Sequence, residues 1–576
     1  MLVLSRDGPA AGQDRFYFDA LAADEVSIDL AVRDQTRMQL RAVCDGRARR
    51  RSTDMQETSP AWVAPGQPVV IELSPRERFQ TRLELGTEVQ HCDATITPGG
   101  QAPYRLSLLR EDTALPWLSR IDAPLPSCPG GDSTDPLVRA FLATDGMSAS
   151  CPVALGRTRL LPDGLDALDA KVEALLGRRL TRAQLLAGDA DMPLDFSNAP
   201  QLDLIYVNYL NLNADFSGYL ISRMLAWHAA RGTIVRILVS DIMQTETDRR
   251  LFEGLAARYP TVQIQSYRFP AEAADGFEGQ MGRLHRVSHV KLFATLAREP
   301  GRSTAMVGGR NLHEGYFYEE PRDLSAWPFL HQYDPNQTKL TGGFTAYQDF
   351  EIEFQSDVAV RSIIGHMAAL WHRDHDSQAP RPPLPGPQRV TAQDGMVRHF
   401  ISVPFTDGEA QTGYFVGLLD AARHSIHIAI PYLNMPPELE AALNRARDRG
   451  VEVQVVTTVR VREATDFMVT GLNRQFANDF GDWVQFYDYD PVPRLLHAKL
   501  FVIDDRLAII TSTNLNMRSF VHDMENGVVV LDRDVAAQVD AVIGRFIAEG
   551  ERVMPGQEVP RLVQWLRRLG AVTRAF

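Results

Sequence analysis

The segment LLHAKLFVIDDRLAIITSTNLNMRSFVHDMENGVVV, residues 495–530, decides both the fold of this chain and the place of its chemistry. Alternate side chains of a strand share a face, so a strand through HAKLFVI points His497 and Lys499 the same way. Asp504 and Asp505 are turn formers, and the chain returns through LAII as a second strand. The pattern predicts a hairpin with an imidazole and an ammonium on one face.

The returning strand brings three more polar groups to the same place. Ser512 and Asn514 end near the start of the first strand, and Glu525 opens another strand run. The hairpin region therefore gathers a hydroxyl, an amide and a carboxylate beside the imidazole and the ammonium.

The first half of the chain repeats this set in RVSHVKLFATL (286–296), STAMVGGRN (303–311) and YQDFEIEF (347–354). The first segment places a histidine and a lysine on one strand face, the second returns with two glycines and an asparagine, and the third carries two acids on one strand face. Two such copies predict one symmetric site. The residues of the first copy are His289, Lys291, Gly308, Gly309, Asn311, Asp349 and Glu351.

A duplication also extends beyond these motifs. LDLIYVNYLN (202–211) and SIHIAIPYLN (425–434) are both buried-strand runs that end in Tyr-Leu-Asn. Each is followed by a helical stretch that ends at a glycine, Gly232 or Gly450, and then by another strand run. We therefore expect an α/β fold with two duplicated α/β lobes.

The beginning of the chain has a different pattern. Short alternating strand runs between turn formers are typical of an antiparallel sandwich, whereas APRPPLPGP (379–387) is stiff and unable to join a sheet. The predicted parts are a β-rich accessory domain (1–155), a first lobe (156–378), a Pro-rich linker (379–388) and a second lobe (389–576).

The combined set of side chains suits phosphodiester chemistry. Two lysines and two asparagines donate hydrogen bonds to phosphate oxygens and stabilise the developing negative charge. One histidine attacks phosphorus to form a covalent phosphoenzyme, and the other protonates the leaving oxygen, while the acids hold the tautomer of each ring. We expect no required cofactor and no metal at the site, and a regulatory calcium ion stays open.

HAKLFVIDDRLAIITSTN resembles the HxK(x)4D(x)6GSxN signature of the phospholipase D superfamily, with Thr511 where glycine is usual. HVK followed by GGRN resembles the first copy of that motif in bacterial phospholipase D and cardiolipin-synthase-like enzymes. The motif aspartate is missing from this first copy, where Leu296 stands. The resemblance implies two lobes packed as a pseudo-dimer with one active site at their junction.

The resemblance also implies a role for each residue. His289 would be the nucleophile, and His497 the general acid and later the general base. Asp504, the motif aspartate, would support the architecture, and Asp349 is preferred to Glu351 as the partner of a histidine ring. Phosphate would be bound by Lys291, Asn311, Lys499, Ser512 and Asn514.

These observations predict a phospholipase D-type enzyme that acts on glycerophospholipids at a membrane surface and passes the phosphatidyl group to water or to a small alcohol. A metal-independent nuclease and a non-catalytic binding protein on the same fold are the alternatives. A net charge of −13 and a pI near 5.6 disfavour nucleic acid as a partner, because phosphate neutralisation needs clustered lysine and arginine. No oligomeric state follows from the sequence, and a monomer fits it.

Cysteine usage bears on where the protein works. Two disulfides would indicate an oxidising place, a periplasm or the cell exterior, whereas four reduced thiols would not. The first thirty residues lack the basic and apolar regions of a secretory signal, so a cytoplasmic location also stays open. The four cysteines are Cys44, Cys92, Cys128 and Cys151.

Several other motifs fit an ordinary structural role better than a functional one. HRDHD (372–376) fits a solvated helix end better than a metal cluster, and the basic run 47–51 fits a solvated loop better than a lipid headgroup site. The aromatics of GYFYEE and SAWPFL fit a packed loop core better than a lid or a bilayer contact. Three further histidines have no spacing of their own: His285, His313 and His331, the first two being candidates to line the cleft.

Overall fold

The structure is a computed structural model, and the chain divides into two compact units. The first comprises Met1–Ala123, Ala226–Ile234 and Glu253–Gln263, and the second comprises Pro124–Leu225, Val235–Phe252 and Ile264–Phe576. The residues described are 2–4, 15–18, 26–32, 36–52, 60–74, 81–110, 128, 131, 133–144, 146–267, 286–334, 343–371, 390–404, 408–460 and 467–568.

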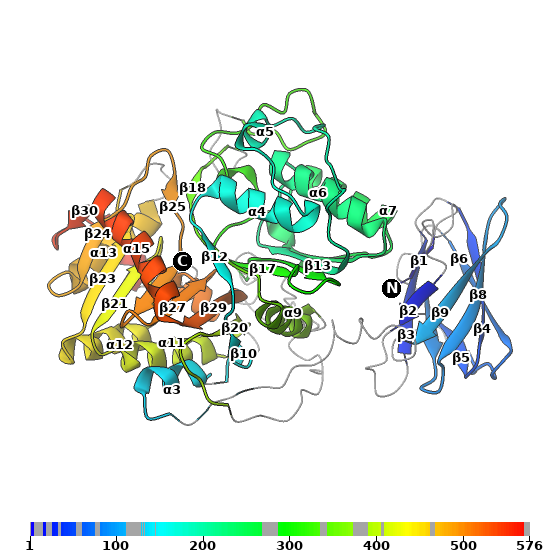
Figure 1. The fold of residues 1–576 in the computed structure, drawn as a ribbon, viewed down its shortest axis with the longest axis horizontal. Coiled ribbons are helices and arrows are strands. Elements are labelled where there is room, and N and C mark those ends of the chain that lie inside the picture. The colour runs from blue at the N-terminus through cyan, green and yellow to red at the C-terminus, as the bar shows by residue number, and fades with distance from the viewer. Residues whose placement is uncertain are drawn as a thin grey trace. The chain divides into compact units, whose positions relative to one another are not determined.

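The first nine strands form two sheets around one core (Figure 1). Leu30 and Leu83 of one sheet and Leu40 and Ile96 of the other belong to the same buried cluster. One sheet has the order β1 (Leu2–Leu4), β3 (Val26–Val32), β7 (Thr81–Leu85), β5 (Ala48–Ser52), and the other the order β2 (Arg15–Phe18), β9 (Tyr104–Arg110), β8 (His91–Pro98), β4 (Met38–Cys44), β6 (Pro68–Leu73).

The basic run near residue 50 lies in strand β5, so the expectation of a solvated loop is wrong. Arg49 and Arg51 each form an ion pair of 2.6 Å with Glu84 of the neighbouring strand β7. Register explains the pairing, because Arg49 lies directly opposite Glu84 in the antiparallel ladder.

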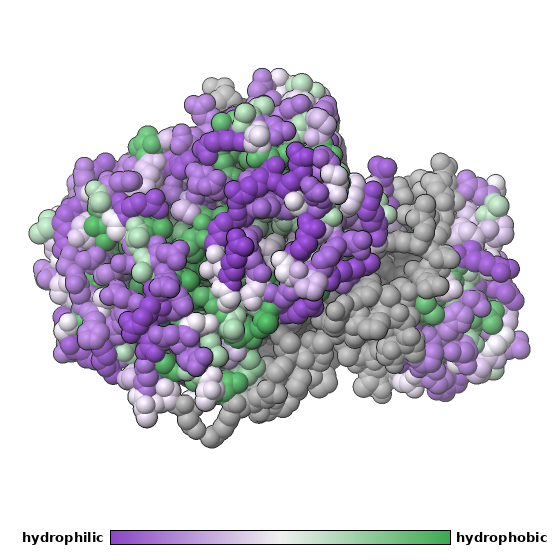
Figure 2. Space-filling view, in the orientation of Figure 1, coloured by the Kyte–Doolittle hydropathy of each residue, from purple (hydrophilic) through white to green (hydrophobic). Residues whose placement is uncertain are grey.

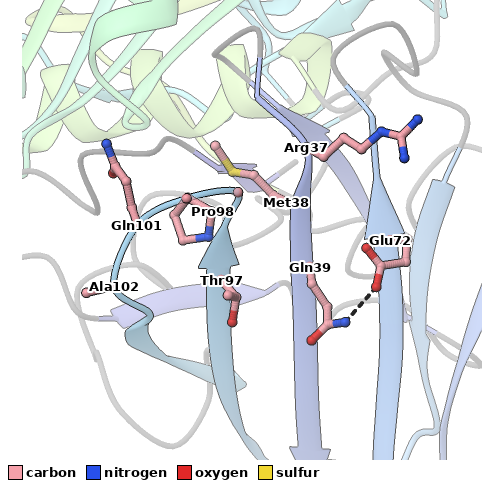
Figure 3. Close-up of a pocket in the computed structure, with 10 residues that line it drawn as sticks. Arg37, Met38, Gln39, Glu72, Thr97, Pro98, Gln101 and Ala102 are labelled. Atoms are coloured by element: carbon pink, nitrogen blue, oxygen red, sulfur yellow. Dashed lines mark hydrogen bonds between the residues drawn. The ribbon is translucent and has the colours of Figure 1, made fainter.

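A shallow hollow of about 400 Å³ lies at one end of the second of these sheets (Figure 3). Gln39 donates a hydrogen bond of 2.6 Å to Glu72 across its floor, and Pro98 and Gln101 border it. Its lining contains none of the histidines, lysines or acids of the predicted site.

The chain after the first nine strands forms two large sheets, and four consecutive strands of one sheet have the same order and directions as four of the other. The order of the seven-stranded sheet is β12 (Thr158–Leu161), β19 (Glu351–Phe354), β17 (Thr304–Gly308), β16 (Leu292–Ala297), β13 (Leu202–Tyr209), β14 (Ile234–Ser240), β15 (Val262–Tyr267). The other sheet has the path β10 (Ser148–Ala149), β20 (Met396–Ser402), β29 (Glu525–Leu531), β27 (Leu507–Thr511), β26 (Leu500–Ile503), β21 (Ser425–Ala429), β23 (Glu452–Thr457), β24 (Gln485–Asp488), β30 (Glu551–Val553), with β11 (Val153–Ala154) also on β20.

Helices follow the strands in both sheets, as the glycine-terminated patterns predict. The described helices that alternate along the sequence with strands of the seven-stranded sheet are α4 (Gly164–Leu176), α5 (Arg182–Ala187), α6 (Phe216–Ala229), α7 (Glu246–Arg258) and α9 (Asp357–Trp371). Those that alternate with strands of the larger sheet are α3 (Pro136–Leu142), α11 (Ala410–Ala421), α12 (Pro437–Asp448), α13 (Phe467–Phe480), α14 (Met517–Val521), α15 (Arg533–Glu549) and α16 (Arg561–Arg568).

The boundary of the first unit differs from the one expected near residue 155. The first segment of this unit ends at Ala123, and strands β10 and β11 pair with β20 of the larger sheet. The cause is a long-range strand pairing, which local sequence patterns do not report. The predicted linker, 379–388, lies outside the described residues.

All four cysteines are paired, Cys44 with Cys92 and Cys128 with Cys151. No helix in the described part of the chain has both the length and the apolar character needed to cross a bilayer. In the view of Figure 2, hydrophilic residues cover most of the described surface and apolar ones lie between them in small groups.

Candidate active site

The first histidine of the predicted set is held by an acid from the other sheet. His289 follows the isolated bridge between Ser288 and Met524, and its backbone N–H donates to the Met524 carbonyl at 2.8 Å. This pairing brings the ring Nδ1 to 2.9 Å from Oε2 of Glu525. Because Nδ1 is engaged, Nε2 is the nitrogen left for chemistry.

The second histidine, His497, precedes strand β26 of the larger sheet and is held by an acid that precedes strand β19 of the seven-stranded one. β18 (Tyr347–Gln348) pairs in parallel with β25 (Leu495–Leu496), and the His497 backbone N–H donates to the Gln348 carbonyl at 2.8 Å. The ring Nδ1 of His497 then lies 2.6 Å from Oδ2 of Asp349. The two histidine–acid pairs are therefore reciprocal, each joining one sheet to the other.

The two lysines lie beside the histidines and are almost fully buried. Lys291 Nζ donates to the His289 carbonyl at 2.9 Å, and Lys499 Nζ lies 2.8 Å from His497 Nδ1. The pKa of Lys291 is held well below its usual value and that of Lys499 falls to about 8, in both cases because burial penalises the charged form. An anionic ligand would relieve this penalty.

Burial and these lysines also act on the histidines. Burial, then Lys291 and Lys499, hold the pKa of His289 well below its usual range. Burial and Lys499 lower the pKa of His497 to about 3. Both rings are therefore neutral at pH 7 in the free protein. Because Lys499 acts on His289 and Lys291 acts on His497, the four groups occupy one electrostatic neighbourhood.

The two acids differ in charge state. Burial raises the pKa of Glu525 to about 7 against the opposing pull of Lys291. Burial also acts to raise the pKa of Asp349, but His497 and Lys499 outweigh it, so that the pKa lies below its usual value. Asp349 is thus a carboxylate at neutral pH, whereas Glu525 is partly protonated.

The predicted phosphate-binding side chains lie in the same region and are buried. The Ser512 hydroxyl donates a hydrogen bond to the carboxylate of Glu525, which also holds His289. The side-chain amide of Asn311 donates to the hydroxyl of Tyr316 at 3.1 Å. The Oδ1 atom of Asn514 is buried and has no hydrogen-bond partner among the described residues. Such an unsatisfied group is typical of a site that a ligand completes.

Two supporting residues act through the backbone. A Cβ on Gly309 would lie 2.3 Å from Oδ1 of Asp349, so glycine is the residue that lets this carboxylate sit where it does. Asp504 accepts hydrogen bonds of 2.7 to 3.1 Å from the backbone N–H groups of residues 423–425. It ties the turn of the β26–β27 hairpin to the start of β21.

Glu351 is paired away from both predicted histidines. Its carboxylate forms an ion pair of 2.7 Å with Lys171 of α4, and both side chains are fully buried. The expectation that Asp349 and Glu351 share one strand face is wrong, because the strand is interrupted between β18 and β19. Asp349 itself lies in that break, which leaves it free to turn toward His497.

Aromatic side chains that sequence reasoning did not assign surround His497. The ring of Tyr316 lies edge-on at 5.3 Å, Tyr347 at 5.2 Å and Tyr432 at 6.4 Å, measured between centroids. Tyr316 and Tyr347 stack on each other at 4.6 Å. The GYFYEE segment is therefore packed loop core, as preferred, and the shared Tyr-Leu-Asn at 432–434 was the available signal for Tyr432.

Asn526 is a further residue that sequence reasoning missed. Its Oδ1 accepts a hydrogen bond of 2.9 Å from the backbone N–H of Lys291, and its Nδ2 donates to the Lys291 carbonyl at 3.2 Å. The amide thus fixes the backbone of Lys291 from the opposite sheet.

The other predicted histidines take structural roles where they are described. His313 is half-buried, with its ring 4.8 Å from that of Tyr316. His331 lies 3.7 Å from Asp248. His285 and the run 372–376 fall outside the described residues. Phe467, Met468 and Phe476 belong to α13.

One group of side chains in the described residues has the composition of a metal site. His427, Asp505 and Asp540 place ligand atoms within 4.8 Å of one another. His427 Nδ1 is already bonded to Asp540 at 2.6 Å, which raises its pKa, so the group is explained as an ion pair. None of the three residues belongs to the histidine–lysine set.

Comparison with known proteins gives concordant results. Residues 415–547 match the family model described as cardiolipin synthase, PLD-like domain. The chain is 25% identical over 429 residues to cardiolipin synthase A of Pseudomonas aeruginosa, covering 74% of this chain and 73% of that protein. It is 23% identical over 377 residues to cardiolipin synthase A of Pseudomonas putida, covering 64% of this chain and 69% of that protein.

The fold also has a counterpart among solved structures. Phosphatidylserine synthase of Haemophilus influenzae superposes with a TM-score of 0.52 at 14% identity, covering 76% of this chain and 100% of that one. At this identity the likeness concerns the fold.

Proposed function

Because this chain belongs to the phospholipase D superfamily, we propose that it transfers the phosphatidyl group of a glycerophospholipid to an acceptor alcohol through a phosphohistidine intermediate. One observation carries this proposal above all. The site holds two histidine–acid pairs that exchange partners between the sheets, with a buried lysine beside each histidine. Such a set offers a nucleophile, a proton donor and two cations for a single phosphodiester.

In the first step, His289 acts as the nucleophile. It is neutral, and its Nδ1 is held by Glu525, so Nε2 presents its lone pair to phosphorus. The N–P bond forms as the bond from phosphorus to the headgroup oxygen breaks. Lys291 and Lys499 stabilise the charge on the phosphoryl oxygens.

His497 supplies the proton that the leaving oxygen needs. Its pKa in the free protein is low, and the negative charge of a bound phosphodiester opposes the effect of the lysines and raises it. The ionised carboxylate of Asp349 favours the protonated ring more than the partly neutral Glu525 does for His289. This difference supports His497 as the acid and His289 as the nucleophile.

In the second step, the neutral His497 accepts a proton from the incoming hydroxyl. The acceptor oxygen attacks phosphorus, the N–P bond breaks, and His289 regains its lone pair. An alcohol headgroup as acceptor gives a new phospholipid, and water gives phosphatidic acid. The similarity to cardiolipin synthases supports an alcohol as the preferred acceptor.

We further propose that the two sheets are duplicated lobes. The neighbours β19, β17, β16 and β13 correspond in order and direction to β29, β27, β26 and β21. Each lobe then contributes the acid that holds the other lobe's histidine. The paired cysteines support an oxidising compartment as the place of action.

The test is product analysis after incubation with vesicles of mixed phospholipids that include phosphatidylglycerol, in the presence of a chelator. We expect cardiolipin and free glycerol, and phosphatidylethanol when ethanol is added, with none of these from the His289→Asn protein. Phosphatidic acid alone would mean hydrolysis. Cleavage of a plasmid without any lipid product would replace the proposal with nuclease activity.

A further inference from the structure

The last described helix, α16, leaves an apolar face uncovered. Leu562 is 50% exposed and Trp565 is 56% exposed, and they share a face because they are three residues apart. Met554, in the segment before the helix, is 61% exposed. The opposite side is anchored by Val563, which is buried in a small cluster with Met468, Leu472 and Val559.

All the charged residues of this helix are basic. Its sequence, RLVQWLRR, contains three arginines and no acidic residue, and Arg561 at its start is exposed. An apolar face with tryptophan beside arginines is typical of helices that lie in the interface of a bilayer. The exposed guanidinium of Arg561 complements the anionic headgroups of such a surface.

The helix also lies close to the active-site edge of the larger sheet. It packs on α13, which follows β23 in the chain. Asn473 of α13 accepts a hydrogen bond from the Leu433 N–H at 2.8 Å and donates to the Pro431 carbonyl at 2.8 Å. These contacts flank Tyr432, whose ring faces His497. One helix therefore separates α16 from the aromatic group around His497.

We propose that α16 docks the protein on the surface of an anionic phospholipid bilayer through Leu562 and Trp565, with Arg561 among the headgroups. This inference rests on the proposed function, since a site that takes bilayer lipids needs its edge held at the membrane. Docking next to the sheet edge that carries Tyr432 would bring the headgroups of the bilayer lipids close to His497.

Vesicle sedimentation with the full-length His289→Asn protein tests the docking without turnover. On equimolar phosphatidylcholine and phosphatidylglycerol, we expect Leu562→Ser with Trp565→Ser to weaken binding by about tenfold or more. Arg561→Gln should weaken binding to these vesicles and leave binding to pure phosphatidylcholine unchanged. Matched controls on other helices are Val358→Ser, also exposed, and Arg250→Gln, and neither should alter binding.

Two results would overturn the docking proposal. One is a double variant that binds the mixed vesicles as tightly as its parent. The other is a dimer of the parent protein in solution, measured without vesicles, together with a monomeric double variant. That result would assign the apolar face of α16 to contact with a second copy of the chain.

A turnover measurement separates this proposal from the proposed function. In the otherwise wild-type protein, the double variant should keep its kcat on a soluble p-nitrophenyl phosphodiester and lose activity on vesicles. If binding weakens as expected but no phosphodiester is turned over, docking stands and the enzymatic proposal fails. If the protein turns over phosphodiesters but the double variant binds vesicles as well as its parent does, the enzymatic proposal stands and docking through α16 fails.

Discussion

His289 and Glu525 stand 236 positions apart in the sequence, yet their side chains meet at 2.9 Å between Nδ1 and Oε2. His497 and Asp349 meet in the same way over 148 positions. A site whose proton-holding acids are exchanged between two sheets requires both sheets to be in place before either histidine is oriented. The chemistry of this chain therefore depends on the packing of the two halves and not on either motif alone.

Removing each acid should give a different kinetic signature. Asp349→Asn leaves His497 without the carboxylate that favours its protonated form, so we expect a loss of roughly 10³-fold or more in kcat with a phospholipid. The loss should shrink with a p-nitrophenyl ester, because p-nitrophenol leaves without a proton. Glu525→Gln acts on the nucleophile, and its loss should be the same for both substrates. Equal leaving-group dependence in the two variants would contradict the assignment of roles.

Glu351 should matter for stability and not for chemistry. Glu351→Gln leaves Lys171 buried without its counter-charge, which costs about 3–5 kcal/mol in the free energy of unfolding. Urea unfolding measures this loss, and kcat per folded molecule should stay near that of the wild type. The double substitution Glu351→Leu with Lys171→Met removes both charges and should recover most of the stability. A large fall in kcat at full folding would place Glu351 in the site.

Gly309 should be intolerant of a single methyl group. A Cβ there meets the Asp349 carboxylate at 2.3 Å, so Gly309→Ala must move the partner of His497 and lower kcat by at least tenfold. Gly254→Ala is the matched control, since nothing lies within 4 Å of a Cβ at that position. It lies within α7 and should stabilise the helix by up to about 1 kcal/mol. Wild-type activity of Gly309→Ala would refute the steric argument.

The alkaline limb of the pH profile should belong to Lys499. Its pKa of about 8 means that the ammonium loses its charge as the pH rises through 8, and phosphate stabilisation is lost with it. The profile of kcat/KM should therefore fall above pH 8. Lys499→Arg keeps the charge at all these pH values, so the limb should move to higher pH even if the absolute rate is lower. A limb that stays near pH 8 in that variant would assign it to another group.

The local parts of this structure could be predicted from the sequence, and the long-range parts could not. The β26–β27 hairpin and the turn at Asp504 follow from alternation and turn chemistry, whereas His497 and Lys499 lie between β25 and β26 and not within the expected strand. Which acid holds which histidine depends on pairing between strands of different sheets, and no spacing reports that. The break between β18 and β19 also has no local signal, so Glu351 was expected beside Asp349.

The boundary of the first unit and the tyrosines of the site were missed for the same physical reason. Residues 148–154 read as the end of a β-rich domain, but they pair with β20, whose residues lie about 250 positions later. Tyr316 and Tyr347 come from separate segments and meet only in the folded chain. Tertiary packing places such residues, whereas sequence patterns describe their immediate neighbours.

In the proposed mechanism, His289 carries the phosphatidyl group during turnover. Trypsin cuts after Arg286 and Lys291 in the unmodified chain and so releases VSHVK, whereas the peptide with the other histidine is LLHAK, residues 495–499. The His497→Asn protein, mixed with a short-chain phosphatidyl-p-nitrophenol and a chelator, should accumulate the intermediate, because this leaving group needs no acid. After an alkaline quench, mass spectrometry should find the phosphatidyl adduct on His289. Release of p-nitrophenol by this protein with no adduct on His289, or an adduct formed by the His289→Asn protein, would contradict the account.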